Sequence, residues 1–222
     1  VLSNTQISTD TFNLLLPTSA QIQDPKKVKA AIEHMRSQKL IFSTWVDHRL
    51  LHPDWADLLK EYHLQEVERN TIMMLEHTGD IDPVTSSSLT IKEVLDEQTL
   101  FDYKHIFIEL FKGSTEAAAL EDYFQHFSIK KLHSKARMFV GYEHHKPVTT
   151  GLLFETNDSY GIYDVMTREE HRGKGLGSDM FHYLLTKTEN KQKCVILQAS
   201  ADGKNIYQRA GFQAIGEMAV FE

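Results

Sequence analysis

Apolar positions along the chain recur either every three to four residues, as in helices, or in short runs, as in strands. A period of three to four residues predicts helices over residues 26–39 and 54–62. The same period predicts one or two amphipathic helices over residues 99–131, with a break at Gly113-Ser114. Shorter runs rich in β-branched and aromatic residues predict strands over residues 41–46, 71–76, 90–95, 136–143, 149–155 and 160–167.

The last part of the chain alternates between the two patterns. We expect a helix over residues 176–188, a strand over 194–199, a short helix over 204–209 and a stop at Gly211. A final strand over residues 214–222 follows. Helices interleaved with strands in this way predict an α/β fold with a mixed sheet.

One segment breaks the periodic pattern and suggests a domain boundary. The run HTGDIDPVTSSSL, starting at His77, contains Gly, Pro and three serines and almost no large apolar residue, which is typical of a linker. We therefore predict an N-terminal part over residues 1–78, a linker over 79–88 and a larger domain over 89–222.

Composition narrows the class of protein. The 222 residues are 41% apolar and 25% charged, which is ordinary for a soluble globular protein. No apolar run approaches the roughly 18 residues of a membrane helix, and the leucines at 14–16 lack the basic lead-in of a secretory signal. The single cysteine, Cys194, excludes a disulfide framework and most thiolate zinc sites. We expect a cytoplasmic protein with no membrane partner, a monomer or a homodimer.

Charge and histidine placement argue against two kinds of ligand. The formal net charge is -7, and the 24 basic residues are scattered among acidic ones, so nucleic acid is a poor candidate partner. His144 and His145 are adjacent in an expected hairpin turn, where neighbouring side chains point apart. The sequence therefore predicts no metal site.

The stretch HRGKGLGSDM, His171 to Met180, has glycines at three alternate positions between an expected strand and an expected helix. Glycine permits positive φ and lets an anion approach the backbone N–H groups at the positive end of a helix, so the stretch suggests a phosphate site. A tight turn is the plainer alternative. A P-loop is excluded because no GK[ST] follows the spacer, and a dinucleotide fingerprint would need glycine at Met180.

A longer pattern around these glycines points to a family. The run YDVMTREEHRGKGLGSDMFHYLL, followed by VILQAS and IYQRAGF, resembles the GNAT superfamily of acyl-CoA-dependent N-acyltransferases. The matching motif residues are Arg172, Gly175, Gly177, Tyr207, Gly211 and Phe212. The resemblance covers residues 89–222 and implies a GNAT fold, in which the strand before the loop splays from its neighbour.

The resemblance also implies a binding mode for acetyl-CoA. The backbone of the glycine loop would hold the diphosphate, with the Arg172 and Lys174 side chains free to add positive charge. The N–H of Val165 would polarise the thioester carbonyl, and Thr167 would contact the pantetheine amides. The expected cofactor-binding residues are Val165, Met166, Thr167, Arg172, Gly173, Lys174, Gly175, Leu176, Gly177, Ser178 and Asn205.

Two proton-transfer roles follow from the same resemblance. Tyr207 would be the general acid that protonates the departing CoA thiolate. The reference pKa of a phenol, near 10, exceeds that of a thiol, near 8.5, by only about 1.5 units, so this proton transfer is feasible. The alternative is a tyrosine that packs its helix against the sheet. Many family members have a glutamate as base where this chain has Gly161. The candidate bases are Asp164, which we assign to catalysis, and Glu155, His144 and His145, with a solvated surface residue as the alternative for each.

The N-terminal part resembles a shortened copy of the same fold. Residues 62–74 align with residues 210–222 without gaps and share Gln65 and Gln213 before a strand. We therefore predict a degenerate GNAT-like α/β subdomain, as in tandem GNAT proteins. Leu59 stands where Tyr207 would, and no glycine-rich loop precedes it, so this copy should not bind acetyl-CoA. Three aromatic residues of this part either line the acceptor side of the cleft or belong to the hydrophobic core: Phe42, Trp45 and Trp55.

Two functions from different classes stay open. The first is an N-acetyltransferase that moves an acetyl group from acetyl-CoA to a primary amine by direct transfer in a ternary complex, the amine belonging to a small molecule, a peptide or a protein lysine. The second is a CoA-binding regulatory or sensory module without efficient catalysis. Tyr207 favours the first, and Gly161 leaves room for the second. The identity of the acceptor does not follow from the sequence.

Overall fold

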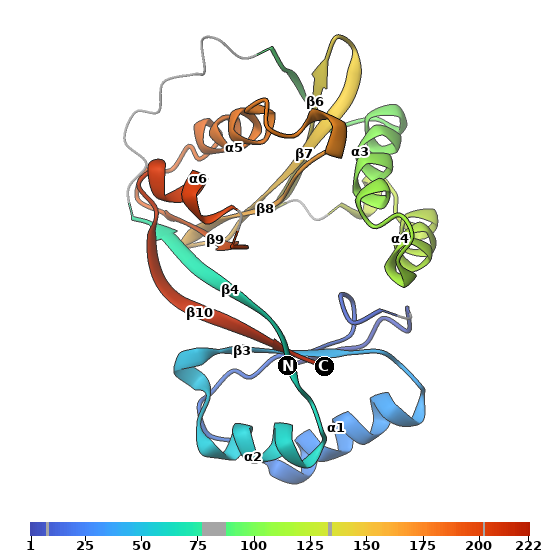
Figure 1. Cartoon of the computed structure of the whole chain (residues 1–222), viewed down its shortest axis with the longest axis vertical. Coiled ribbons are helices and arrows are strands. Elements are labelled where there is room, and N and C mark those ends of the chain that lie inside the picture. The colour runs from blue at the N-terminus through green and yellow to red at the C-terminus, as the bar shows by residue number, and fades with distance from the viewer. Residues whose placement is uncertain (8, 77–87, 133–134, 202) are drawn as a thin grey trace. The chain divides into compact units, whose positions relative to one another are not determined.

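The computed structural model describes all residues except 8, 77–87, 133–134 and 202 (Figure 1). It divides into two compact units. Unit 1 comprises Val1–Met73, Gln198–Tyr207 and Ala214–Glu222, and unit 2 comprises Met74–Leu197 and Gln208–Gln213. The predicted linker over residues 79–88 lies almost entirely outside the described residues, and the predicted domain boundaries stay predictions.

Unit 2 is a twisted mixed sheet with helices on both faces. Its strands lie in the order β9-β8-β7-β6-β5, in which β5 to β8 are antiparallel neighbours and β9 is parallel to β8. The strands are β5 (Thr90–Glu93), β6 (Ala136–Glu143), β7 (Lys146–Glu155), β8 (Ser159–Thr167) and β9 (Cys194–Ala199). The helices are α3 (Glu97–Leu110), α4 (Thr115–His126) and α5 (Leu176–Thr186), with 3₁₀ turns at Ile129–Lys131 and Glu169–His171.

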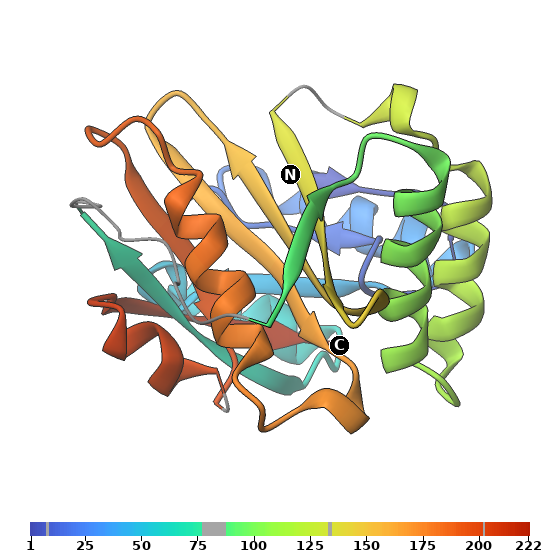
Figure 2. The same cartoon turned by 90° about the horizontal axis from the view of Figure 1, so that it is seen from above.

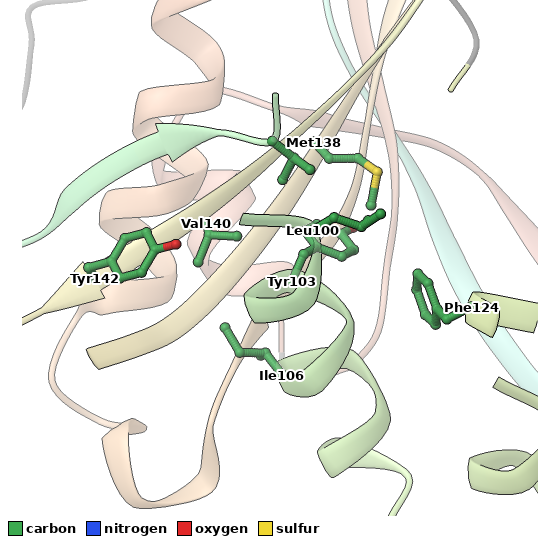
Figure 3. Packing of buried hydrophobic residues seen from close by; sticks show 8 residues of the cluster. Leu100, Tyr103, Ile106, Phe124, Met138, Val140 and Tyr142 are labelled. Carbon is green, nitrogen blue, oxygen red and sulfur yellow. The ribbon is translucent and has the colours of Figure 1, made fainter. Parts of the chain in front are cut away.

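Alternation along β6 decides which helix covers which face. Met138, Val140 and Tyr142 pack with the side chains of α3 and α4, as Figure 3 shows. Phe139, on the opposite face, contacts Tyr183 of α5, with ring centroids 5.6 Å apart. Figure 2 shows the same arrangement, with α5 on one side of the strands and α3 and α4 on the other. The period of two along the strand thus gives the sheet two buried faces.

Local signals start and separate the helices of unit 2. The Asp96 side chain accepts a hydrogen bond from the N–H of Thr99 at 2.7 Å, and the Thr99 hydroxyl accepts one from the N–H of Asp96, which forms a capping box at the start of α3. Gly113 has φ +91° and separates α3 from α4. The predicted helix break is therefore confirmed.

Unit 1 has strands in the order β1-β2-β3-β10-β4 and three helices. The strands are β1 (Leu2–Ser3), β2 (Leu14–Leu15), β3 (Ser43–Asp47), β4 (Glu66–Leu75) and β10 (Gln213–Phe221), and the helices are α1 (Pro25–Ser37), α2 (Pro53–Glu61) and α6 (Lys204–Arg209). A 3₁₀ turn spans His48–Leu50. The unit boundaries cross β4, β9, α6 and β10 near one end of each.

The aromatic residues of the N-terminal part mostly form its core. Phe42 and Trp55 are 7% and 4% exposed and belong to a cluster with Ile32 and Met35 of α1. The Trp55 indole also donates a hydrogen bond to the carbonyl of Ser19 at 3.1 Å. For these two residues the structure supports the core interpretation, since their side chains are used within the unit.

The faint internal repeat has a counterpart in backbone conformation. In the gapless alignment His63 corresponds to Gly211, and both residues have positive φ, +54° and +91°. Each follows a helix and precedes a strand, α2 and β4 in one case and α6 and β10 in the other. A left-handed residue is a common way to end a helix, and glycine takes this conformation without strain. The repeated helix–turn–strand unit supports the interpretation of the N-terminal part as a copy.

We predict that Gly211→Ala lowers the free energy of unfolding by about 1 kcal/mol, because alanine pays the steric cost of positive φ. An added Cβ would meet only Leu75 Cδ1 at 3.5 Å, so the cost comes from backbone conformation and not from crowding. Urea unfolding measures the change. Gly216→Ala is the control, because Gly216 is not among the residues with positive φ and an added Cβ there would lie 3.4 Å from the end of the Arg49 side chain. Equal stability of the two variants would contradict the prediction.

Candidate active site

The centre of the site is a bulge between β7 and β8. One residue of β7, Gly151, faces two residues of β8, Asp164 and Val165. Asp164 has φ +53°, a conformation that aspartate tolerates better than most residues. Its carbonyl accepts a hydrogen bond from the fully buried hydroxyl of Thr150 at 2.8 Å, which fixes the bulge. A bulge of this kind re-aims the side chain that it carries.

Beyond the bulge, β8 presents alternate backbone groups to β7. The carbonyl of Met166 accepts a hydrogen bond from the Thr149 hydroxyl at 2.5 Å, and the N–H of Arg168 donates to a β7 carbonyl at 3.0 Å. Because successive residues of a strand present their N–H and C=O groups to opposite sides, the backbone groups of Val165 and Thr167 face away from β7.

The side of β8 away from β7 is open. The parallel pairing of β8 with β9 consists of Ser159↔Cys194, Tyr160↔Val195 and Gly161↔Ile196, and no further pair joins them along the described course of β8 to Thr167. The predicted splaying of the strand before the loop is therefore present. An extended chain that lies beside this edge would meet the backbone groups of Val165 and the N–H of Thr167, which need partners. The carbonyl of Thr167 already accepts a hydrogen bond from Arg172 Nε.

The glycine loop joins this open edge to α5. Gly173 and Gly175 have φ +74° and +85°, and a Cβ added to either would meet no atom within 4 Å. Glycine is used here for backbone direction and not for lack of room. A Cβ on Gly177 would lie 3.1 Å from the Thr167 hydroxyl, so the first turn of α5 packs closely on the end of β8. No side chain of the described chain caps α5, so its first N–H groups face outward as they do in anion sites.

Side chains of the loop tie it to the sheet. His171 Nδ1 lies 2.9 Å from Glu143 Oε2, and Lys174 Nζ lies 3.7 Å from the same oxygen. Arg172 Nε donates a hydrogen bond to the carbonyl of Thr167 at 3.1 Å. The Arg172 side chain, expected to be free to help with phosphate charge, thus uses one nitrogen to hold the loop against the strand that precedes it.

Asp164 lies in an environment of phenols. Tyr103 of α3, 1% exposed, donates a hydrogen bond from its hydroxyl to Asp164 Oδ2 at 2.9 Å. Removal from water raises the pKa of the Asp164 carboxyl, and the Tyr103 bond offsets part of that rise. Burial first, and then the charge of Asp164, raise the pKa values of Tyr123 and Tyr163. A carboxylate with a raised pKa is a better proton acceptor than an exposed one.

The other candidate bases are placed less favourably. The Glu155 carboxylate is 2.5 Å from Lys193 Nζ, and this hydrogen bond lowers the Glu155 pKa. His144 and His145 are exposed and form the two-residue turn between β6 and β7, with φ +49° and +66°. Of the four candidates, Asp164 is the one beside the open part of β8.

The structure also explains the glycine where many family members have a glutamate. A Cβ on Gly161 would lie 2.5 Å from the ring of Tyr163. The tyrosine ring therefore occupies the space that a side chain at position 161 would enter.

Two predicted site residues lie in the segment Gln198–Tyr207, which groups with unit 1. The Tyr207 ring packs over Gly203, whose added Cβ would lie 3.1 Å from Tyr207 Cε2, and burial raises the Tyr207 pKa. Asn205 is exposed. Their roles stay predictions. Gly211 and Phe212 follow in unit 2, where Phe212 is 3% exposed and its ring centroid lies 5.7 Å from that of Phe181 of α5.

The structure adds site residues that the sequence did not indicate. Tyr103 holds Asp164, and Thr149 and Thr150 bond the carbonyls of β8. A groove of about 640 Å³ also lies between α3 and α4, with Arg168 at its edge and charges of both signs along its walls. Arg168 Nη1 is 3.1 Å from Glu109 Oε2 within this groove. No distinctive sequence signal marks these residues, because each has the residue type expected of a helix face or a buried strand.

Comparison with known proteins shows which family this part of the chain is similar to. A family model of the acetyltransferase (GNAT) domain matches residues 134–214, which include the bulge, the glycine loop and Tyr207. Residues 134–214 therefore match the GNAT acetyltransferase domain. No curated protein sequence matches the chain.

Solved structures show that the GNAT fold extends through most of the chain. A protein of unknown function from Staphylococcus epidermidis has a TM-score of 0.75 at 18% identity, over 97% of this chain and 86% of that chain. A GCN5-related N-acetyltransferase from Kribbella flavida has a TM-score of 0.68 at 17% identity, over 95% and 80% of the chains. A tandem GNAT protein from the clavulanic acid biosynthesis pathway has a TM-score of 0.61 at 13% identity, over 86% and 66%. The mixed α/β fold with a GNAT-like N-terminal part is confirmed.

Two further features concern metal ions and membranes. Within the described residues, no group of three or more His, Cys, Asp or Glu side chains is arranged to hold a metal ion. None of the helices in the described part of the chain is both long and apolar enough to cross a bilayer.

We predict that Asp164→Asn raises the free energy of unfolding at pH 7. A carboxyl whose pKa is higher in the folded than in the unfolded protein contributes stability below the unfolded value of 3.8 and loses it as the pH rises through the folded value. Asparagine keeps an oxygen for Tyr103, tolerates positive φ and carries no charge. Urea unfolding at pH 4 and pH 7 should show a gain that is larger at pH 7. The control is Asp158→Asn at an exposed position, and an equal gain there would contradict the prediction.

Proposed function

We propose that the chain is an N-acetyltransferase that moves the acetyl group of acetyl-CoA directly to a primary amine while both are bound. The observation that carries this proposal is the continuity of two features, the open backbone edge of β8 at Val165 and Thr167 and the uncapped, glycine-rich start of α5. The first suits the amides of a pantetheine arm, and the second suits a diphosphate.

In this proposal the donor binds chiefly through main-chain atoms. The N–H groups from Gly173 to Ser178 would hold the diphosphate, and the exposed Lys174 would add charge. The N–H of Val165 would face the thioester carbonyl and stabilise the negative charge that develops on its oxygen. Met166 would assist donor binding indirectly, because the hydrogen bond from Thr149 of β7 to its carbonyl holds this part of the β8 backbone in place.

Asp164 is our candidate for the general base. An amine with a pKa near 10.4 must lose a proton before it attacks, which costs about 4.6 kcal/mol at pH 7. The Asp164 carboxylate, adjacent to Val165, would take that proton, and the phenols around it suit a cationic acceptor. The amine nitrogen would then bond to the thioester carbon and, as the C–S bond breaks, lose its second proton to water. Tyr207 would give its own proton to the departing thiolate and regain one from water. We place this reaction in the cytoplasm, because a chain with the single cysteine Cys194 forms no internal disulfide and suits a reducing compartment.

The alternative of a CoA-binding module without efficient catalysis also has support in one observation. Gly161 stands where many family members have a glutamate as base, and the Tyr163 ring covers this position. Binding of acetyl-CoA without release of CoA to any amine would favour this alternative. Steady CoA release in the presence of an amine would exclude it.

We predict that acetyl-CoA at about 100 times its Kd stabilises the protein by roughly 2.7 kcal/mol in thermal unfolding, and that NAD at equal concentration does not. Gly175→Ala should abolish most of this shift, because it forces a side chain to φ +85° in the loop. Gly113→Ala is the matched control, since Gly113 also has positive φ and open space around it but lies between α3 and α4. No shift with the folded wild-type protein would reject both functions.

We predict that Tyr207→Phe lowers kcat by about 10- to 1000-fold, because the thiolate loses its proton donor. The assay follows CoA release against amine concentration across the pH range. Tyr183→Phe, a partly buried tyrosine of α5 that packs on Phe139, should retain wild-type kcat. A Tyr207→Phe enzyme with unchanged kcat at every pH would remove the acid role from Tyr207.

A further inference from the structure

The Tyr103 side chain is packed in the hydrophobic core of unit 2. It is 1% exposed and belongs to a packed cluster in which Figure 3 shows it beside Leu100 and Ile106 of α3 and near Met138 and Val140 of β6. Within this apolar cluster its hydroxyl has one partner, Asp164 Oδ2 at 2.9 Å. The direction of the phenol O–H is therefore set by core packing and not by solvent.

The backbone of Asp164 is fixed as firmly as the phenol. Its positive φ is maintained by the bulge opposite Gly151 and by the hydrogen bond from Thr150 to its carbonyl. In the described chain, the Oδ1 atom of Asp164 accepts no hydrogen bond, while Oδ2 is bound to Tyr103. One carboxylate oxygen is thus held and the other is left for another donor.

We propose that Tyr103 is a positioning residue of the transfer reaction: it holds Oδ2 of Asp164 so that Oδ1 receives the proton of the acceptor amine. This inference rests on the proposed function, because it assigns Tyr103 a role in the acyl transfer of that same site. Tyr103 itself touches neither substrate nor acetyl-CoA. A second consequence is chemical, since a hydrogen bond to the charged form keeps the carboxylate ionised and ready to act as a base.

The groups that face Asp164 make Tyr103 the one suited to this role. They are Tyr103 from α3, Tyr123 from α4 and Tyr163 from β8, together with the uncharged Thr150 from β7. All three titratable neighbours are phenols, which carry no positive charge that could balance the carboxylate. Burial raises the pKa of each phenol and so keeps it neutral. The Tyr103 hydrogen bond is the one that lowers the Asp164 pKa.

The experiment compares Tyr103→Phe with Tyr142→Phe in the full chain. Tyr142 provides a matched control, because its hydroxyl also donates to a carboxylate, Asp102 Oδ2 at 2.7 Å, within the same unit. The assay measures kcat and KM for CoA release, with an amine acceptor, from pH 5 to pH 9. Tyr103→Phe should lower kcat about 10- to 100-fold with little change in KM, and should move the acid limb of the profile upward by about one pH unit. Tyr142→Phe should leave both unchanged.

Two further measurements keep the test independent of folding and of turnover. Replacing Tyr103 with 3-fluorotyrosine keeps the ring and makes the phenol a stronger donor, so the acid limb should move downward instead. A ¹³C NMR titration of the Asp164 carboxyl, assigned by its loss in Asp164→Asn, should show a higher midpoint in Tyr103→Phe than in the wild type.

The outcomes separate this inference from the proposed function. Wild-type protein that binds acetyl-CoA but releases no CoA to any amine overturns the proposed function and this role together. Wild-type turnover with a Tyr103→Phe profile like that of Tyr142→Phe overturns the role of Tyr103 alone. An unchanged Asp164 titration in Tyr103→Phe overturns it as well, whatever the kinetics show.

Discussion

One extra residue in β8 is the constraint on which the site depends. Because Gly151 faces both Asp164 and Val165, the alternation of β8 shifts by one position at the bulge. That shift turns the backbone of Val165 and Thr167 to the open side, and it turns the Asp164 side chain toward α3. The opposite strand meets the bulge with a glycine for a clear reason. A Cβ on Gly151 would lie 2.8 Å from Leu184 of α5, so no larger residue lets the helix approach.

The same bulge holds the Asp164 carboxylate in an environment that costs stability. Removal from water disfavours the charged form of the Asp164 carboxyl and raises its pKa. Among the described residues the side chains that face it are phenols and a threonine. A structural role would be served better by an uncharged residue. The threonine bonds to the carbonyls of β8 hold the strand in this shape regardless of the charge. The arrangement therefore supports our proposal that Asp164 accepts a proton in the transfer reaction.

Much of this fold follows from local sequence patterns, and the parts that do not follow have physical reasons. The helices, most strands and the glycine loop were predicted, because their signals lie within a few neighbouring residues. The strand β4 starts at Glu66 and not at residue 71. Its first four residues are exposed, three of them are charged, and they show no apolar run. The two-residue strands β1 and β2 are too short to give a pattern. The bulge depends on pairing between strands, and Tyr103 has the residue type of any buried helix position, so the Tyr103–Asp164 pair appears only when α3 and β8 are brought together.

The N-terminal copy shows which feature separates a GNAT scaffold from an anion site. In the copy, α1 precedes β3 as α5 precedes β9, but the two helices start differently. The Asp24 side chain accepts a hydrogen bond from the N–H of Lys27 at 3.0 Å, and Pro25 in the first turn has no N–H. A carboxylate already occupies the positive end of α1 and repels a second anion. The start of α5 has glycines and no side-chain cap, so its N–H groups are left for a ligand. The copy has kept the fold, including the left-handed residue after its second helix, while its first helix has filled the position that a diphosphate would need.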